Sequence, residues 1–172
     1  MKSDRIVWWL KKDFRLEDNP ALTFALSNAK NVLPVFVLEP SALNAPETSA
    51  FHVGAWLEAI KSLRTRLRKE GGDICALVSE VVPAFDRLRE IIDFEAVVSH
   101  VEIGSDRTFQ RDKDFAKWCS ENGVKWTELK RRVSFVVSAI VTKDLIAGSS
   151  GWASQCRRLE SRLSRGSLLH QQ

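Results

Sequence analysis

The sequence predicts an α/β fold, a three-layer, doubly wound, Rossmann-like domain built on a five-stranded parallel sheet. Short apolar runs typical of buried strands alternate with segments of helical periodicity through residues 5–129. Such alternation indicates parallel strands joined by right-handed helical crossovers. The chain has 172 residues, of which 44% are hydrophobic, and this is enough for one domain with a sizeable core.

The first strand is expected at residues 6–10, a continuous apolar run typical of a strand covered on both faces. A charged loop follows at residues 11–18. Asn19 is a good N-cap and Pro20 suits the first helical position, so a helix should begin there. The charges therefore collect at the edge of the sheet where ligands of open α/β proteins bind. In an arbitrary α/β protein, such a loop is more often only a solvated turn.

Four further strands are expected at residues 31–38, 73–79, 96–100 and 124–129, with helices at residues 50–70, 83–92 and 106–122. Pro34 cannot donate to a strand ladder, which favours an edge strand or an early position within the strand. Residues 41–49, rich in Ser, Ala, Asn and Pro, are expected to form a loop. The long helix carries basic residues in its last turns, where they suit the helix dipole, and Gly71 should end it.

Residues 9–22 read Trp-Leu-Lys-Lys-Asp-Phe-Arg-Leu-Glu-Asp-Asn-Pro-Ala-Leu. This string closely resembles the N-terminal signature of DNA photolyases and cryptochromes, W-(F/H)-R-(R/K)-D-L-R-L-x-D-N-P-A-L. The departures are mild: Leu10 replaces an aromatic residue, Lys11 an Arg and Phe14 a Leu. A second stretch, residues 99–112, resembles the loop and helix in which this family carries an acidic residue ahead of an Arg-Asp pair.

The resemblance covers residues 5–129 and implies the N-terminal domain of a light-dependent deoxyribodipyrimidine photolyase, a carbon–carbon lyase that repairs pyrimidine dimers in DNA. In that family FAD lies in a C-terminal helical domain, which also contacts DNA and which this sequence lacks. The N-terminal domain holds an optional antenna chromophore: a folate, a deazaflavin, a flavin or a lumazine. A cryptochrome photoreceptor is the alternative. The 172-residue chain alone is expected to be inactive in repair.

The antenna site, if present, is expected at the carboxyl edge of the first, second and fourth strands, whose loops would line one crevice. The residues expected to line it are Lys12, Asp13, Phe14, Arg15, Glu39, Phe51, His100 and Glu102. Phe51 would offer a stacking face. His100 is more readily explained as a capped or core histidine, and the Arg111-Asp112 pair is more often structural. Asp112 and Asp114 fall on different faces of a helix and are expected to be solvated.

Several other sites are not indicated. No P-loop, G-x-G-x-x-G, nucleophile elbow or H-E-x-x-H occurs, so no catalytic residue is assigned. Cys75, Cys119 and Cys156 are odd in number and far apart, which favours reduced thiols over a metal site or disulfides. A stand-alone nucleotide-binding α/β protein stays as a weaker alternative, although its only glycine-rich candidate, residues 148–151, follows no clear strand–helix junction.

Charge divides the chain into a domain at residues 1–129 and a basic connecting tail at residues 130–172. The first part holds 18 Lys and Arg against 20 Asp and Glu, and the tail holds 8 against 2. Basic tails can bind nucleic acid, but the charge of the globular part alone does not indicate a DNA-binding face. An apolar run at residues 133–141 favours a poorly packed or dimer-forming tail. We expect neither a leader nor a membrane span, and we therefore expect a cytoplasmic protein.

Overall fold

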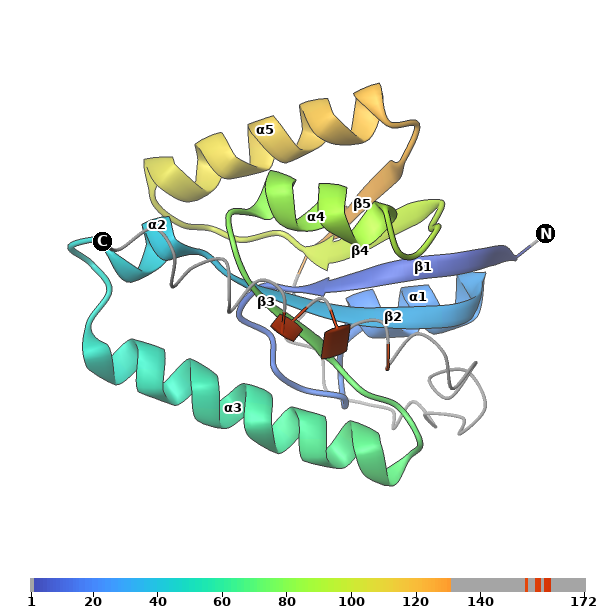
Figure 1. Ribbon diagram of the computed structural model, residues 1–172, viewed down its shortest axis with the longest axis horizontal. Helices are drawn as coiled ribbons and strands as arrows, with labels where there is room; N and C mark the ends of the chain where they lie inside the picture. Colours follow the sequence, from blue (N-terminus) through green and yellow to red (C-terminus); the bar gives the residue numbers. More distant parts are fainter. Residues whose placement is uncertain (1, 131–153, 155–156, 159, 162–172) are drawn as a thin grey trace.

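The computed structural model describes residues 2–130 together with residues 154, 157, 158, 160 and 161. The five strands form one parallel sheet in the order β3-β2-β1-β4-β5 (Figure 1). The strands are β1 (Ser3–Leu10), β2 (Ala29–Leu38), β3 (Cys75–Val78), β4 (Ala96–His100) and β5 (Lys125–Leu129). The helices are α1 (Pro20–Asn28), α2 (Pro40–Leu43), α3 (Ala50–Lys69), α4 (Val81–Arg89) and α5 (Asp106–Glu121). The predicted α/β class and five-stranded parallel sheet are confirmed.

Helices cover both faces of the sheet, so the domain has three layers (Figure 1). One core cluster joins the sheet to α4 and α5, and a second joins it to α1 and α3. Trp8 lies in the second cluster and Trp9 in the first, because successive side chains of a strand point to opposite faces. Both rings are almost completely buried, as their place in an apolar strand predicts.

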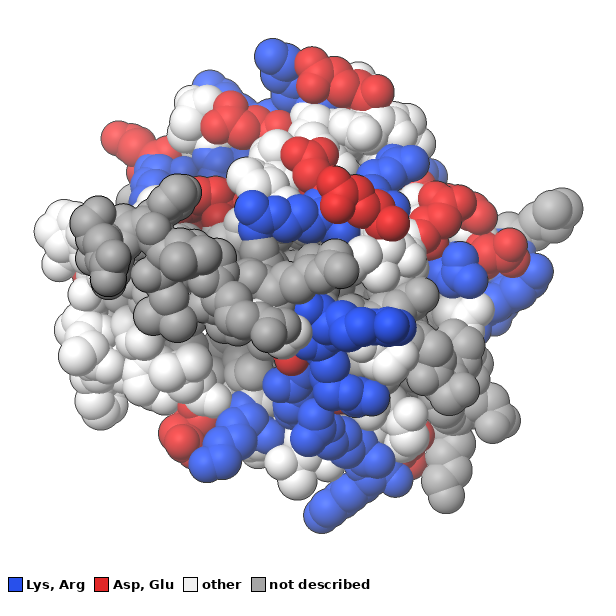
Figure 2. Space-filling model, in the orientation of Figure 1, with Lys and Arg blue, Asp and Glu red and all other residues white. Residues whose placement is uncertain are grey.

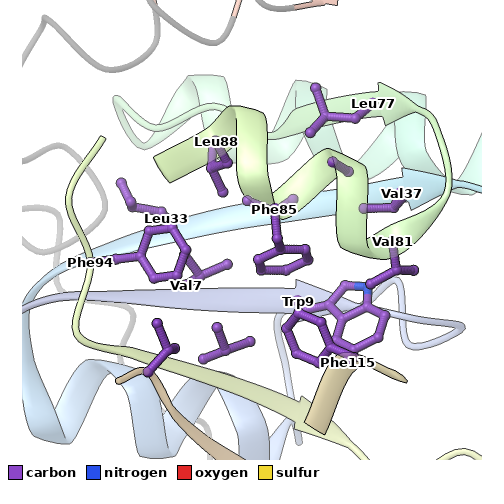
Figure 3. Packing of buried hydrophobic residues seen from close by; sticks show 14 of the residues in the cluster. Val7, Trp9, Leu33, Val37, Leu77, Val81, Phe85, Leu88, Phe94 and Phe115 are labelled. Carbon is purple, nitrogen blue, oxygen red and sulfur yellow. The ribbon is translucent and has the colours of Figure 1, made fainter. Parts of the chain in front are cut away.

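The cluster under α4 and α5 is rich in aromatic rings (Figure 3). The centroid of the Trp9 ring lies 4.7 Å from that of Phe115 and 5.6 Å from that of Phe85, and both pairs meet edge to face. Aromatic pairs prefer this geometry, and each adds about 1 kcal/mol beyond its burial. Trp126 of β5 is only partly buried and packs against the margin of the same cluster. Trp9 thus anchors the end of β1, the strand that leads into the candidate site.

The local signals for α1 and α3 agree with the structure. The Asn19 side chain accepts a hydrogen bond from the Leu22 amide, and Pro20 occupies the first turn of α1. Just before this cap, Asp18 has a φ of 46°, a left-handed conformation that Asp tolerates better than most residues. Gly71, at φ 83°, follows the end of α3, where a residue without a side chain adopts the left-handed conformation most easily.

The structure differs from the expected elements in several places. The helix expected at residues 83–92 is α4, which begins two residues earlier, at Val81, and ends at Arg89. The segment expected to be a loop at residues 41–49 begins within the short helix α2, where Pro40 sits in the first turn. Pro34 lies inside β2, which has neighbours on both sides in the sheet. Its strand pairs with β1 over residues 29–36 but with β3 only from Val35 onward, so Pro34 has a strand partner on one side only. The proline is thus at a local edge within a central strand.

Most of the tail lies outside the described residues. This includes residues 133–141, whose apolar run favoured a poorly packed or dimer-forming tail, and Cys156. Cys75 and Cys119 are buried and in the thiol form, and burial raises the pKa of Cys119 to about 12. Within the part of the chain that the structure describes, no helix has the length and apolar character to cross a bilayer.

Candidate functional site

Four of the expected site residues gather where the winding of the sheet reverses. β1 has β2 on one side and β4 on the other, so the loops after β1 and β4 separate toward opposite faces. In open α/β sheets the crevice at this switch point is the usual place for a ligand. Lys12 and Asp13 follow β1, His100 ends β4, and Glu102 follows it.

Asp13 and His100 form a buried pair across the switch point, with side chains only 1% and 3% exposed. His100 Nδ1 lies 2.6 Å from Asp13 Oδ2, while His100 Nε2 accepts a hydrogen bond of 3.4 Å from the Ala21 amide. Because Nε2 accepts, the proton of a neutral ring lies on Nδ1, which donates to the carboxylate. Asp13 also accepts from the Lys11 amide at 3.0 Å and from Asn19 Nδ2 at 3.3 Å. The pair thus joins the loop after β1, the end of β4 and the start of α1.

A second set of charges lies beside this pair and centres on Arg111 of α5. Its guanidinium is 3.0 Å from Glu39, at the end of β2, and 2.8 Å from Glu102. Lys12 Nζ lies 2.7 Å from the other Glu102 oxygen, and Arg107 lies 3.3 Å from Glu39. Arg111 therefore connects α5 to the edge of the sheet. This is a structural role, as expected for the Arg111-Asp112 pair from the sequence.

Burial and ion pairing compete in this set and give different results for the two carboxylates. Burial raises the pKa of Glu39 above its ordinary value, and the nearby Arg111 charge does not fully offset it. Burial also acts to raise the pKa of Glu102, but the hydrogen bond from Lys12 and the charge of Arg111 outweigh it and lower that pKa. For Arg111, burial lowers the pKa, and the surrounding carboxylates more than reverse this effect. Glu102 is therefore the more firmly ionised of the two carboxylates.

Lys11 is buried as well, although it lies in the charged loop. Its Nζ is 3.0 Å from Asp112 and 3.0 Å from Glu128, and it lies 4.6 Å from the centroid of the Trp9 ring. The expectation that Asp112 is solvated was wrong, because Asp112 faces inward to pair with Lys11 and Arg111. Asp114 is exposed as expected and hydrogen-bonds Gln110 within the helix.

Three cavities border these charges. The largest, about 670 Å³, lies along α4 and α5 and reaches Glu39, Arg107 and Arg111. The second, about 500 Å³, is lined by Lys11, Lys12, Asp13, His100, Val101, Glu102, Ile103 and Lys130, and its volume is within the usual range for small-molecule sites. The third, about 40 Å³, lies between Lys12, Trp9, Trp56, Glu39 and the two arginines of α5. It has room for about one or two water molecules but not for a ring system.

Four of the eight expected residues, Lys12, Asp13, His100 and Glu102, line the 500 Å³ cavity, and Glu39 lines the other two. Phe14 packs instead against Phe36, with ring centroids 5.4 Å apart, and Arg15 pairs with Asp18. Phe51 is 82% exposed and lines none of these three cavities.

Sequence reasoning missed several residues that complete the site: Trp9, Trp56, Val101, Ile103 and Arg107. The spacing of Arg107 and Arg111, four residues apart at the start of α5, was the available signal, because it puts both on one helix face toward the sheet edge. In the described residues, no three His, Cys, Asp or Glu side chains form a group suited to a metal ion.

A family model described as DNA photolyase matches residues 6–149. The chain belongs to the DNA photolyase family. A cryptochrome DASH from Natronomonas pharaonis is 26% identical over 133 residues, covering 72% of this chain and 28% of the relative. A deoxyribodipyrimidine photo-lyase from Synechococcus is 24% identical over 109 residues, covering 63% of this chain and 22% of the relative. The family thus includes both photolyases and cryptochromes, with DNA repair and flavoprotein character.

Solved structures agree with the fold. An archaeal photolyase from Sulfolobus tokodaii, described with two FAD molecules and a novel light-harvesting cofactor, matches with a TM-score of 0.67 at 28% identity, covering 73% of this chain and 29% of that one. A Synechocystis cryptochrome, with a TM-score of 0.68, 15% identity and coverage of 76% and 28%, supports the fold alone. The chain spans about a quarter of the length of the curated relatives it matches.

Proposed function

We propose that this chain is the α/β antenna domain of a light-dependent deoxyribodipyrimidine photolyase and that its 500 Å³ cavity holds a small chromophore. The cavity at the switch point is the observation that carries the proposal. Its lining combines the apolar side chains of Val101 and Ile103 with the cations Lys12 and Lys130. Apolar walls suit a flat ring system, and cations suit its carboxylate or phosphate groups.

A flavin is the favoured chromophore among the folate, deazaflavin, flavin and lumazine that members of the family use. The support is the Sulfolobus tokodaii photolyase, which is described with two FAD molecules. Such a group, when bound, absorbs light and passes the excitation on. The chain's own residues would orient it: Ile103 and Val101 would offer apolar contacts to the ring, and Lys12, held by Glu102, would pair with an anionic group.

Binding is tested by titrating the chain with FAD, a folate and ATP, and following ligand absorbance and fluorescence anisotropy. We expect FAD to bind more tightly than the folate, and we expect Ile103→Asp to weaken FAD binding at least tenfold, since the substitution puts a charge on the apolar wall. Phe109→Asp is the matched control, because Phe109 is also an exposed apolar residue but lies on α5 outside the cavity. Binding of ATP alone would instead favour a stand-alone nucleotide-binding protein.

The repair reaction itself is assigned to a longer protein in which this domain, residues 1–129, is joined through residues 130–172 to a helical domain that holds the catalytic FAD and contacts DNA. The basis is the family membership and the quarter of the relatives' length that the chain spans. A cryptochrome photoreceptor is the second candidate, because cryptochromes DASH are among the relatives. We expect the 172-residue chain, given FAD and light, to leave thymine dimers intact, and their light-dependent loss would overturn the assignment.

A further inference from the structure

A cluster of basic side chains covers the flank of α3 that faces the described part of the tail. It consists of Lys61, Arg64, Arg68, Arg157 and Arg158, here called the basic face. Lys61, Arg64 and Arg68 are three and four residues apart, so they share one flank of the helix. No acidic residue occurs between Glu58 and Glu70 of this helix region.

Three of these arginines converge on one carboxylate. Asp73 lies 2.8 Å from Arg64, 3.1 Å from Arg68 and 3.4 Å from Arg157. Its side chain is only 6% exposed, whereas those of Arg68 and Arg157 are 53% and 55% exposed. Two further carboxylates approach the group: Glu160, 2.7 Å from Arg64, and the exposed Glu58, 3.8 Å from Lys61. Asp73 lies beneath the surface, Arg64 is largely covered, and Arg68 and Arg157 are about half exposed.

The basic face is a local feature that the overall charge conceals. Residues 1–129 carry more acidic than basic side chains, so the charge of the domain as a whole does not indicate a polyanion partner. Figure 2 nevertheless shows a continuous column of Lys and Arg surface running from the centre of the molecule down over the C-terminal half of α3. The fold therefore concentrates positive charge where α3 and the tail meet.

We propose that the basic face binds the phosphate backbone of nucleic acid, independently of base sequence, of any lesion and of a chromophore. Four of its five residues are arginines, whose planar guanidinium groups match phosphate oxygens with paired hydrogen bonds. Lys61 to Arg68 extends about 10 Å along the helix, which corresponds to about three phosphates of one strand. The face lies on α3 and the tail, whereas the 500 Å³ cavity is lined from the loops after β1 and β4 and by Lys130.

An anionic membrane surface fits this face less well. A helix that binds lipid turns its apolar side toward the acyl chains. The apolar side of α3, with Ile60, Leu63 and Leu67, is buried against the sheet. On the outward flank, Leu57, one turn before Lys61, is an exposed large apolar side chain. The flank therefore offers mainly charge and little apolar surface to insert beside it.

The test uses the full 172-residue chain, in the dark and without flavin, and an undamaged fluorescent 20-base-pair duplex followed by anisotropy. For about three phosphate contacts, affinity should fall about 40-fold between 50 and 200 mM salt. The triple variant Lys61→Gln, Arg68→Gln, Arg158→Gln should bind at least tenfold more weakly at 50 mM salt, with a much shallower salt dependence. Arg64 and Arg157 are kept so that Asp73 retains two partners.

The matched control is Lys113→Gln, Lys117→Gln, Lys125→Gln, which removes the same charge from exposed positions on α5 and β5. It should bind the duplex as the unmodified chain does. Equal loss in both triple variants, unchanged binding in the α3 triple, or binding to phosphatidylserine vesicles without binding to the duplex would each overturn the proposal. If the α3 triple fails to fold by circular dichroism, Lys61→Gln and Arg158→Gln are measured singly, and each should lower the salt slope by about one unit.

Discussion

At the scale of single residues, the buried pair of Asp13 and His100 is the most constrained feature of the candidate site. We predict that His100→Leu lowers the free energy of unfolding by about 3 kcal/mol, because it removes a donor to a buried carboxylate. The carboxylate would keep the Lys11 amide and Asn19 as donors but lose its contact with β4. Urea unfolding monitored by circular dichroism measures the change.

The control for this substitution is Lys30→Ala, which breaks an ion pair with Asp4 whose side chains are both largely exposed. Exposed pairs contribute little because water screens them, so the unfolding midpoint should not move measurably. If His100→Leu were as neutral as Lys30→Ala, the pair would not hold the switch point together.

A second residue-level prediction concerns the pH dependence of stability through Asp73. Burial acts to raise the pKa of Asp73, but hydrogen bonds from Arg64 and Arg68 outweigh it and hold the pKa below its ordinary value. A carboxyl group with a lowered folded-state pKa stabilises the fold above its unfolded pKa of about 4, and the contribution is lost as pH falls through the folded value. Asp73→Asn should therefore be less stable than the unmodified chain at pH 7, and the difference should shrink below about pH 4.

Urea unfolding at a series of pH values from 7 to 3 measures this difference. Asp114→Asn serves as a control, since Asp114 is exposed and hydrogen-bonds only within α5. A constant difference between the unmodified chain and Asp73→Asn across the range would show that the Arg64 and Arg68 contacts do not favour the ionised carboxyl.

The candidate site was predictable from sequence where position along a strand decides it. Asp13 and Glu102 follow strand ends, and parallel strands bring their carboxyl ends to one edge. Phe51 was misplaced because its contacts depend on how the segment after β2 turns, and α2 occupies part of that segment. Asp112 was misjudged for a similar reason, since its partner Lys11 is 101 residues away in sequence.

At the scale of elements, β3 shows how the fold treats an exposed strand edge. It is a four-residue strand at one end of the sheet, and the Ala76 amide on it donates to Glu160 at 2.8 Å. Edge strands tend to be short and covered because unpaired amides attract other strands. We predict that Glu160→Ala makes the Ala76 amide exchange with solvent hydrogen about tenfold faster, as expected for loss of a charge-assisted hydrogen bond.

Native-state hydrogen exchange by NMR resolves this single amide. Ser161→Ala is the neighbouring control, because the Ser161 hydroxyl donates to the Arg158 carbonyl within the same turn. It should leave the Ala76 rate unchanged. An unchanged rate in Glu160→Ala would show that this edge is protected by another group.

The elements that the sequence predicted well are those whose signal is local. Asn19 and Pro20 fix the start of α1, and the apolar run of β1 reads as a buried strand without any knowledge of its neighbours. Pro34 was harder to place, because the sheet order puts β2 in the interior while the register leaves this one residue with a partner on one side. Register is a property of two strands and is not encoded in either alone.

At the scale of the whole molecule, the average charge of a domain is a poor guide to its surface. The basic residues of α3 were recognised as partners of the helix dipole, which explains each of them singly. The fold brings Arg157 to Asp73 beside these residues, with the exposed Arg158 next to it in the sequence, and only then do the charges form a face. Because α3 and the tail are far apart in the sequence, the sequence alone does not reveal this arrangement.

The last prediction tests the proposed boundary between the domain and the tail. Both core clusters are built from residues 6–129, so a chain that ends at Lys130 keeps the apolar contacts of all three layers. It loses the contacts of Glu160 with Ala76 and Arg64 and that of Arg157 with Asp73.

We therefore expect the truncated chain to unfold cooperatively, with a free energy of unfolding lower by about 2 kcal/mol. The dependence of that free energy on urea should change little, since it scales with the surface exposed on unfolding. A truncated chain that unfolds without a cooperative transition, or with a much weaker urea dependence, would mean that the tail belongs to the folding unit and that the boundary lies beyond residue 130.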